Sequence, residues 1–274
     1  GHSPRNSIDY LAGLTITADG KTVPWTRDPV DVFAFHFTPP AGAKAVDVAF
    51  DILTPVTPAI GRILVTPEML SLQFLSTALY PAGYYTRQIP VETSVTVPSG
   101  WTIATALVPE RKTGDTPTYK VTSFETVADS PAVAGRNFKA YDLAPGAATP
   151  VRLNVFADRP EQVEATPEQL KIHRDLVTQA VKLFGSQRYD HYEFLVSLSD
   201  NLGGIGLEHH RSSENGLPPK YFTDWNAAWP RHSLLSHEYT HSWNGKFRRG
   251  ADLWTPTFDA PMRDSLLWVY EGQT

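Results

Sequence analysis

The hydrophobic pattern of residues 10–157 predicts β-structure. Apolar residues alternate with polar ones or form short continuous runs, and clusters rich in proline and glycine separate these runs. Asp19-Gly20 lies between two of the runs, where this dipeptide is typical of a two-residue hairpin turn. The clearest expected strands are 31–37 (DVFAFHF), 45–52 (AVDVAFDI), 119–127 (YKVTSFETV) and 151–157 (VRLNVFA).

The pattern becomes helical after residue 160. Thr166 is expected to cap a helix, with Pro167 in the first position and Gln169 completing a capping box. An apolar stripe at helical spacing follows, and Gly185 is expected to end the helix. The stripe consists of Leu170, Val177, Ala180, Val181 and Phe184.

A strand is expected next, over 191–199 (HYEFLVSLS). Because side chains alternate along a strand, one of its faces carries the apolar residues Tyr192, Phe194, Val196 and Leu198. The change from strand-like to helical patterns places a domain boundary at about 158–165. The fold class is therefore predicted to be α+β, with a β-rich N-terminal domain over 1–160 and a second domain over 161–274.

Composition limits the function classes that remain. Of the 274 residues, 41% are hydrophobic and 19% are charged, so the chain can bury a core. A net charge of -5 and the absence of a basic block give no sign of nucleic-acid binding. The chain has no cysteine, which excludes disulfides, thiolate zinc sites and a cysteine nucleophile.

Neither a membrane span nor a signal peptide is visible in the sequence. No apolar run approaches the roughly 20 residues that cross a bilayer, and the chain opens with polar GHSPRNS. It closes with WVYEGQT, inside a segment that is expected to be helical. We therefore expect a fragment, and the missing signal says little about the compartment.

The segment 233–245 (SLLSHEYTHSWNG) combines a helical pattern with candidate metal ligands. His237 and His241 are four positions apart and share one helix face, and neutral imidazoles are good zinc ligands. Glu238 points beside this position and could act as a general base for water. Asn244-Gly245 is a plausible helix stop. The alternative is a surface helix with two unrelated histidines.

A third ligand is expected from a neighbouring segment, because catalytic zinc usually has three protein ligands. Glu271 lies in the apolar run 263–274 (RDSLLWVYEGQT), where a buried carboxylate needs a partner. Two histidines and one glutamate form a known catalytic zinc set. The alternatives are an exposed Glu271 at a helix edge, or a ligand drawn from Asp252, Asp259 and Asp264.

The segment 236–274 resembles the glycyl aminopeptidase family of zinc peptidases (metallopeptidase family sixty-one, of the gluzincin type). Segments 202–216 (LGGIGLEHHRSSENG) and 9–37 are also similar to that family. The resemblance implies that His237, His241 and Glu271 bind Zn²⁺ and that Glu238 is the catalytic base. It also implies a β-rich domain, a thermolysin-like and mainly helical catalytic domain that is partial here, and often a PDZ domain. Gly250 departs from the family pattern, where proline is expected.

A glycine-rich segment precedes the expected zinc helix. Gly203, Gly204 and Gly206 would let another backbone come close, so an extended peptide could bind beside them. By resemblance, Glu208 would hold the free α-amine of the substrate. The alternative is a simple glycine turn with a solvated Glu208.

Together these observations predict a zinc-dependent aminopeptidase that hydrolyses the N-terminal bond of a peptide substrate. A preference for glycine or alanine, and an exported or periplasmic bacterial location, follow from the resemblance alone. The alternatives are a zinc endopeptidase with the same metal site, and a non-catalytic peptide-binding protein that contains zinc. The sequence does not indicate the oligomeric state.

Overall fold

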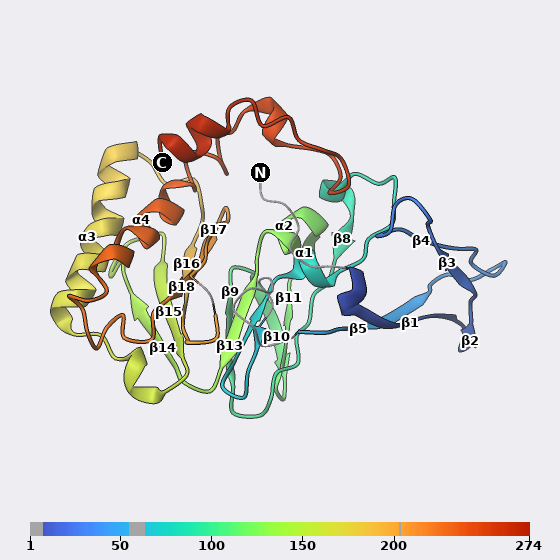
Figure 1. The fold of residues 1–274 in the computed structure, drawn as a ribbon, viewed down its shortest axis with the longest axis horizontal. Coiled ribbons are helices and arrows are strands. Elements are labelled where there is room, and N and C mark those ends of the chain that lie inside the picture. The colour runs from blue at the N-terminus through green and yellow to red at the C-terminus, as the bar shows by residue number, and fades with distance from the viewer. Residues whose placement is uncertain (1–7, 55–63, 203) are drawn as a thin grey trace. The chain divides into compact units, whose positions relative to one another are not determined.

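The computed structural model describes residues 8–54, 64–202 and 204–274 (Figure 1). Gly203, one of the three glycines singled out above, lies outside the described residues. The residues up to 54 form one compact unit and those from 64 onward form another. Each unit is therefore described by itself.

The N-terminal unit consists of short antiparallel strands. They are β1 (Leu11–Ala18), β2 (Lys21–Thr22), β3 (Trp25–Arg27), β4 (Phe35–Phe37) and β5 (Asp47–Ile52), after a 3₁₀ turn at Ile8–Tyr10. A three-stranded sheet has the order β2-β1-β5, and β3 pairs with β4. Asp19 and Gly20 have positive φ angles of 49° and 74° between β1 and β2, so the predicted two-residue hairpin is confirmed.

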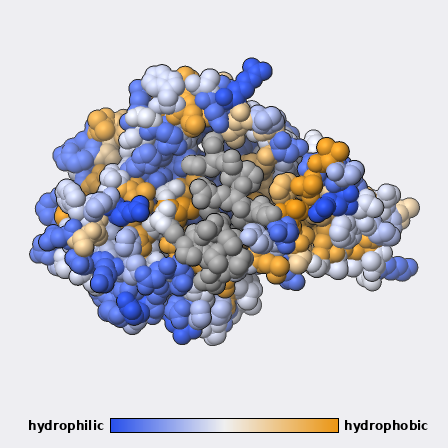
Figure 2. Space-filling model, in the orientation of Figure 1, coloured by the Kyte–Doolittle hydropathy of each residue, from blue (hydrophilic) through white to orange (hydrophobic). Residues whose placement is uncertain are grey.

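This small sheet covers few of its own apolar side chains. Ile16, Ala18 and Val23 form its buried cluster, while Val30 and Phe33 are among the exposed apolar residues. Orange atoms mark such residues on the surface in Figure 2.

The second unit contains the longer elements. Its strands are β6 (Leu64–Val65), β7 (Met69–Leu72), β8 (Pro90–Val91), β9 (Thr102–Thr105), β10 (Pro109–Thr113), β11 (Thr116–Tyr119), β12 (Thr122–Ser123), β13 (Ala132–Gly135), β14 (Phe138–Asp142), β15 (Val151–Ala157), β16 (Tyr192–Leu198), β17 (Gly206–Glu208) and β18 (Ser212–Leu217). Its α-helices are α1 (Phe74–Thr77), α2 (Phe124–Ala128), α3 (Pro167–Phe184) and α4 (Ser233–Thr240). Short 3₁₀ turns occur at Thr86–Gln88, Pro160–Val163, Trp229–Arg231 and Ala251–Leu253, and a π-helical turn spans Trp268–Gly272.

A five-stranded sheet is the framework of this unit. Its order is β14-β15-β16-β18-β17, with β15, β16 and β18 parallel and an antiparallel strand at each edge. α3 connects β15 to β16 and, with α4, covers one face of the sheet (Figure 1). The predicted apolar face of β16, from Tyr192 to Leu198, packs toward these helices. Leu195 points to the other face and packs with Met69 and Val133 of the four-stranded sheet β6-β7-β13-β9.

Local signals predicted α3 well. Thr166 Oγ1 accepts the Gln169 backbone N–H at 3.3 Å, and Gln169 Oε1 accepts the Thr166 N–H at 2.8 Å. Gly185 ends the helix with φ of 68°. The capping box and the glycine stop are therefore both confirmed.

The predicted strand at 119–127 is wrong in its second half. Phe124–Ala128 forms helix α2, because Ser123 Oγ accepts the Thr126 N–H at 3.2 Å and caps the first turn. The apolar residues Phe124 and Val127 are three positions apart and are both buried, which fits one face of a helix.

The predicted domain boundary near residue 160 stays a prediction. Strands from both sides of it, β14 and β15 before and β16 after, belong to one sheet. The α+β fold class itself agrees with the architecture of this unit. No helix in the described part of the chain is long and apolar enough to cross a membrane.

Candidate metal centre

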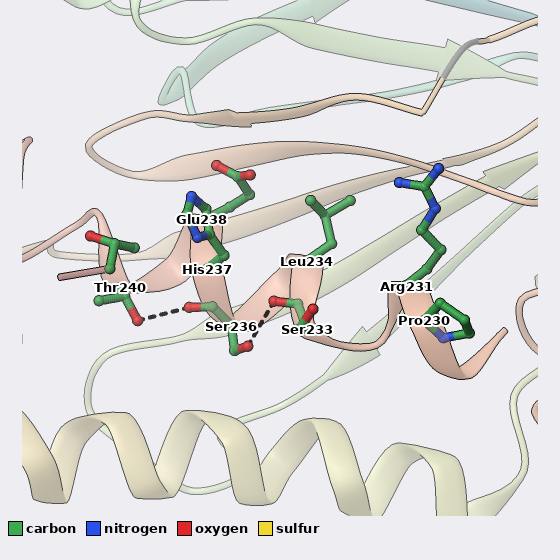
Figure 3. A pocket seen from close by; sticks show the side chains of 9 residues that line it. Pro230, Arg231, Ser233, Leu234, Ser236, His237, Glu238 and Thr240 are labelled. Atoms are coloured by element: carbon green, nitrogen blue, oxygen red, sulfur yellow. Dashed lines mark hydrogen bonds between the residues drawn. The ribbon is translucent and has the colours of Figure 1, made fainter. Parts of the chain in front are cut away.

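Helix α4 presents the histidine motif from a fixed position on the sheet. Leu235 and Tyr239, four positions apart, are both buried. The Tyr239 ring lies 4.7 Å from that of Tyr192 on β16 and 5.0 Å from that of Trp243. This aromatic packing fixes one face of the helix, so the opposite side carries His237 and Glu238 toward the pocket (Figure 3).

The helix ends earlier than its pattern predicted. It stops at Thr240, not at Asn244, and His241 is its C-cap. The N–H groups of Lys246 and Phe247 instead bind the carbonyls of His241 and Ser242, five residues back. This turn over residues 241–247 is wider than an α-helical turn, in which the bonds reach four residues back. It changes the direction of the chain after His241, which stays beside His237.

Three donor atoms from the predicted ligands form a nearly regular triangle. The Nε2 atoms of His237 and His241 are 3.2 Å apart, and Glu271 Oε2 lies 3.3 Å from the first and 3.4 Å from the second. Tetrahedral zinc with ligands at about 2.0–2.1 Å separates its donor atoms by roughly 3.3–3.4 Å. The triangle therefore has the size and the donor types that Zn²⁺ requires.

His241 is oriented by a backbone carbonyl. Its side chain is fully buried, and its Nδ1 lies 3.0 Å from Asn244 O, so Nδ1–H donates and Nε2 keeps its lone pair for a metal. Burial lowers the pKa of His241, which favours the neutral imidazole that binds metals. The His237 side chain is 39% exposed and faces the pocket.

Asn244 links the histidine helix to the segment that carries Glu271. Its Nδ2 donates to Val269 O at 2.9 Å and to Thr274 Oγ1 at 3.0 Å. The sequence suggested only a helix stop at this position. The side chain instead holds the π-helical turn Trp268–Gly272 against the end of α4, so that Glu271 faces the histidines.

The segment around Glu271 is less buried than predicted. Tyr270 is buried, but Leu266 and Trp268 are 43% and 66% exposed, so this apolar segment is only partly buried. The Asp252 carboxylate accepts the Ser265 N–H at 3.2 Å. Within the described part of the chain, neither it nor Asp259 or Asp264 joins a metal-binding group.

Glu238 lies beside the triangle and against the edge strand β17. Its carboxylate is within 4.8 Å of the two imidazoles, and the residue is buried. A Cβ placed on Gly206 would lie 1.9 Å from Glu238 Oε1 and 2.6 Å from Leu234 Cδ1. Gly206 was predicted to admit a substrate backbone, but here its missing side chain makes room for the proposed base itself. A Cβ placed on Gly204 would similarly lie 3.0 Å from the Arg231 guanidinium.

Glu208 is buried at the end of β17 and close to the histidines. Tyr270 donates its hydroxyl hydrogen to Glu208 Oε1, and the Tyr270 ring lies 4.6 Å from the His241 ring. Burial and the neighbouring Glu208 carboxylate raise the pKa of Tyr270, so its hydroxyl stays protonated and remains a donor. The alternative of a solvated Glu208 does not fit this burial.

A buried network of charged groups begins at His209, the residue that follows Glu208. His209 Nδ1 lies 3.2 Å from Asp129 Oδ1 and its Nε2 lies 3.1 Å from Glu214 Oε2. Lys246 Nζ pairs with Asp129 at 2.6 Å, and Gln73 Nε2 donates to Glu214 at 2.6 Å. The network joins the C-terminal ends of β17 and α2 to β18 and to the loop after α4. No sequence pattern predicted this network, because most of its members lie far apart along the chain.

This network predicts a specific pH dependence of stability. Burial opposes the charge of His209, but its hydrogen bonds to Asp129 and Glu214 outweigh burial and raise its pKa to about 9. An unfolded histidine has a pKa near 6.5. The stabilisation is therefore complete below about pH 6.5 and is lost as the pH rises toward 9.

We expect urea unfolding to show a loss on the order of 2–3 kcal/mol between pH 6.5 and 9. A His209→Gln variant should be less stable at pH 6.5 and show a flatter profile. The exposed His36, which pairs with Asp28, offers a matched control in His36→Gln. Parallel pH profiles for wild type and His209→Gln would refute this role of His209.

Sequence comparisons place two family descriptions on the chain. The description "Peptidase M61 N-terminal domain" matches residues 1–136, and "M61 glycyl aminopeptidase" matches residues 231–274. The second match contains the proposed zinc ligands and Glu238. No curated protein matches the chain.

Several solved structures share the fold. An aminopeptidase N family protein from Idiomarina loihiensis is 18% identical, with a TM-score of 0.76 over 97% of this chain and 45% of that chain. An M1 zinc metallopeptidase from Deinococcus radiodurans, in a variant bound to Tyr-Ser-Ala substrate, is 15% identical, with a TM-score of 0.51 over 85% of this chain and 55% of that chain. Native yeast LTA4 hydrolase is 12% identical, with a TM-score of 0.52 over 86% of this chain and 38% of that chain. The chain thus spans 38% to 55% of these proteins.

Proposed function

Because the chain belongs to the M61 glycyl aminopeptidase family, we propose that it carries the zinc site of an aminopeptidase that removes the first residue of a peptide. The observation that supports this most directly is the triangle of His237, His241 and Glu271 donor atoms, with Glu238 beside it. These three side chains would hold the ion. Zinc, when bound, would polarise the scissile carbonyl and lower the pKa of water at the site.

Glu238 would move the proton in this reaction. Its carboxylate would accept a proton from the attacking water and pass it to the leaving amine. The carboxylate lies against Gly206, in space that any larger residue at that position would fill, and this positioning helps a base act at one point.

Glu208 would select substrates with a free α-amine. A protonated amine would form a charge-assisted bond with this buried carboxylate, beside the Tyr270 hydroxyl. Anchoring the amine there would leave the first peptide bond at the metal. The Tyr-Ser-Ala substrate of the Deinococcus relative supports a peptide as the substrate class. A preference for a first residue of glycine or alanine follows from the family alone.

Matched substrates test this proposal. We expect the zinc-loaded protein to cleave a free tripeptide with a kcat/KM about 10²-fold or more above that of the N-acetylated peptide, because acetylation removes the positive charge that would bind the buried Glu208 carboxylate. Glu208→Gln should weaken cleavage of the free peptide strongly and change that of the acetylated one little. The matched control is Glu161→Gln, whose side chain is 63% exposed, in a surface ion pair with Arg159.

The same measurement separates the rival functions. Equal cleavage of free and N-acetylated peptides by wild type would indicate an endopeptidase. No cleavage of either peptide by protein with one bound zinc would indicate a non-catalytic zinc protein that binds peptides.

A further inference from the structure

The edge strand β17 has backbone groups available for a peptide. Ile205 O accepts the Gly216 N–H at 2.8 Å, and the His209 N–H donates to Ser212 O at 2.9 Å. Both bonds join β17 and its ends to β18. In an antiparallel ladder the intervening residues Gly206 and Glu208 direct their N–H and C=O groups to the opposite edge. That edge can bind an extended peptide, as an added strand would.

Side chains from Trp229–Arg231, α4 and the turn Trp268–Gly272 face this strand in a defined order. Arg231 borders Gly204, Glu238 borders Gly206, and Tyr270 binds Glu208. Figure 3 shows Arg231 and Glu238 pointing to the same side, with Arg231 at the end away from the histidine. Arg231 and Glu208 therefore lie at opposite ends of the open edge formed by residues 204–208, and the proposed base lies between them.

Arg231 has the properties of a carboxylate-binding group. It is exposed, and none of the described carboxylates forms an ion pair with its guanidinium. It lines the same pocket, of about 460 Å³, as His237 and Glu238. A guanidinium binds a carboxylate through two parallel hydrogen bonds, which gives both charge and geometric recognition.

The edge is blocked at its Glu208 end, and this determines the direction in which a bound peptide would run. Beyond Glu208 the chain enters the buried network, where the His210 N–H binds Asp129 Oδ2 at 2.9 Å. A peptide with its α-amine at Glu208 must therefore extend toward Gly204. These two residues are four positions apart, which corresponds to about 13 Å along a strand. An extended peptide of three or four residues spans about the same length.

We propose that Arg231 binds the C-terminal carboxylate of the substrate and so makes peptides of three or four residues the preferred substrates. This rests on the proposed aminopeptidase function. The peptide is held at both ends, by Glu208 at its amine and by Arg231 at its carboxylate. Arg231 is a specificity-determining residue and takes no part in the proton transfers at Glu238.

The test compares alanine peptides of two, three, four and six residues, each as free acid and as C-terminal amide. We expect kcat/KM for the free acids of three and four residues to exceed that for their amides about 10-fold, mainly through a lower KM. This ratio should fall at high salt, because the ion pair between Arg231 and the substrate carboxylate is solvent-accessible. Arg231→Gln should abolish this difference. Arg231→Lys should keep part of it, because the charge remains but the bidentate geometry is lost.

Two controls make the outcome decisive. Arg159→Gln removes another exposed arginine from a surface turn and should keep the wild-type preference. Peptide amides with aspartate as the last residue test whether Arg231 binds an acidic side chain instead of the C-terminal carboxylate. The proposal would be overturned if the aspartate amides, but not the free acids, were cleaved better than the alanine amides. It would also be overturned if Arg231→Gln kept the preference for free acids.

Binding separates this proposal from the function on which it rests. Zinc-loaded Glu238→Gln should bind the tripeptide acid about 10-fold more tightly than its amide in calorimetry, and adding Arg231→Gln should remove the difference. If no peptide is cleaved by wild type but this difference persists, the aminopeptidase function fails and the role of Arg231 stands. Equal binding of acid and amide refutes the role of Arg231.

Discussion

Replacing Glu238 with glutamine is expected to lower kcat by about 10²–10⁴-fold while the protein keeps its zinc. Glutamine has nearly the same shape, so it still fits the space that Gly206 leaves beside the helix. Its amide cannot accept a proton from water. The His237, His241 and Glu271 donor atoms remain in place, so metal analysis should still find one zinc per chain.

Ser236 provides a matched control on the same helix. Its hydroxyl donates to Ser233 O at 2.8 Å, and it also lines the pocket. Ser236→Ala should therefore leave kcat within about twofold of wild type, because no proton transfer passes through it. If Glu238→Gln turned over peptide at nearly the wild-type rate, another group would have to act as the base.

Features that depend on neighbouring residues could be predicted from the sequence. The capping box at Thr166 and the Asp19-Gly20 turn involve residues within three positions of each other, so their composition determines their geometry. The same is true of His237 and His241, because a single helical turn separates them. Glu271 required the family resemblance as well, since thirty residues separate it from His241.

Features that depend on distant parts of the chain could not be predicted. Asp129 and His209 are eighty residues apart, and Tyr270 and Glu208 sixty-two, so no periodicity relates them. Asn244 was visible in the sequence, but its bonds to Val269 and Thr274 depend on how the later segment folds back. The groups that position the site therefore became apparent only in three dimensions.

The prediction for Gly206 shows a second way in which the sequence alone is insufficient. A glycine in a strand indicates close approach of another group, and the sequence predicted a substrate backbone at Gly206. In the structure, the Glu238 side chain lies close to this glycine. The sequence could not tell which group approaches. The nearest atoms belong to Glu238 and Leu234, so this position controls the base as well as the edge where a peptide would bind.

Removing His241 is expected to remove the zinc. Its imidazole is fully buried, and Asn244 O fixes its Nδ1–H, so Nε2 is the best oriented of the three donors. In His241→Ala the metal would keep two protein ligands instead of the three that a catalytic site needs. We expect zinc to fall from one per chain to a small fraction after dialysis, and peptide cleavage to fall with it.

His36→Ala serves as the matched control for this loss. It also removes one histidine, but from the N-terminal unit, where the side chain is exposed and pairs with Asp28. Its zinc content should stay at the wild-type value. Circular dichroism should show that both variants remain folded, so that zinc loss in His241→Ala reflects the missing ligand. One zinc per folded His241→Ala chain would mean that His241 is not a ligand, and the triangle of His237, His241 and Glu271 would then not be the metal site.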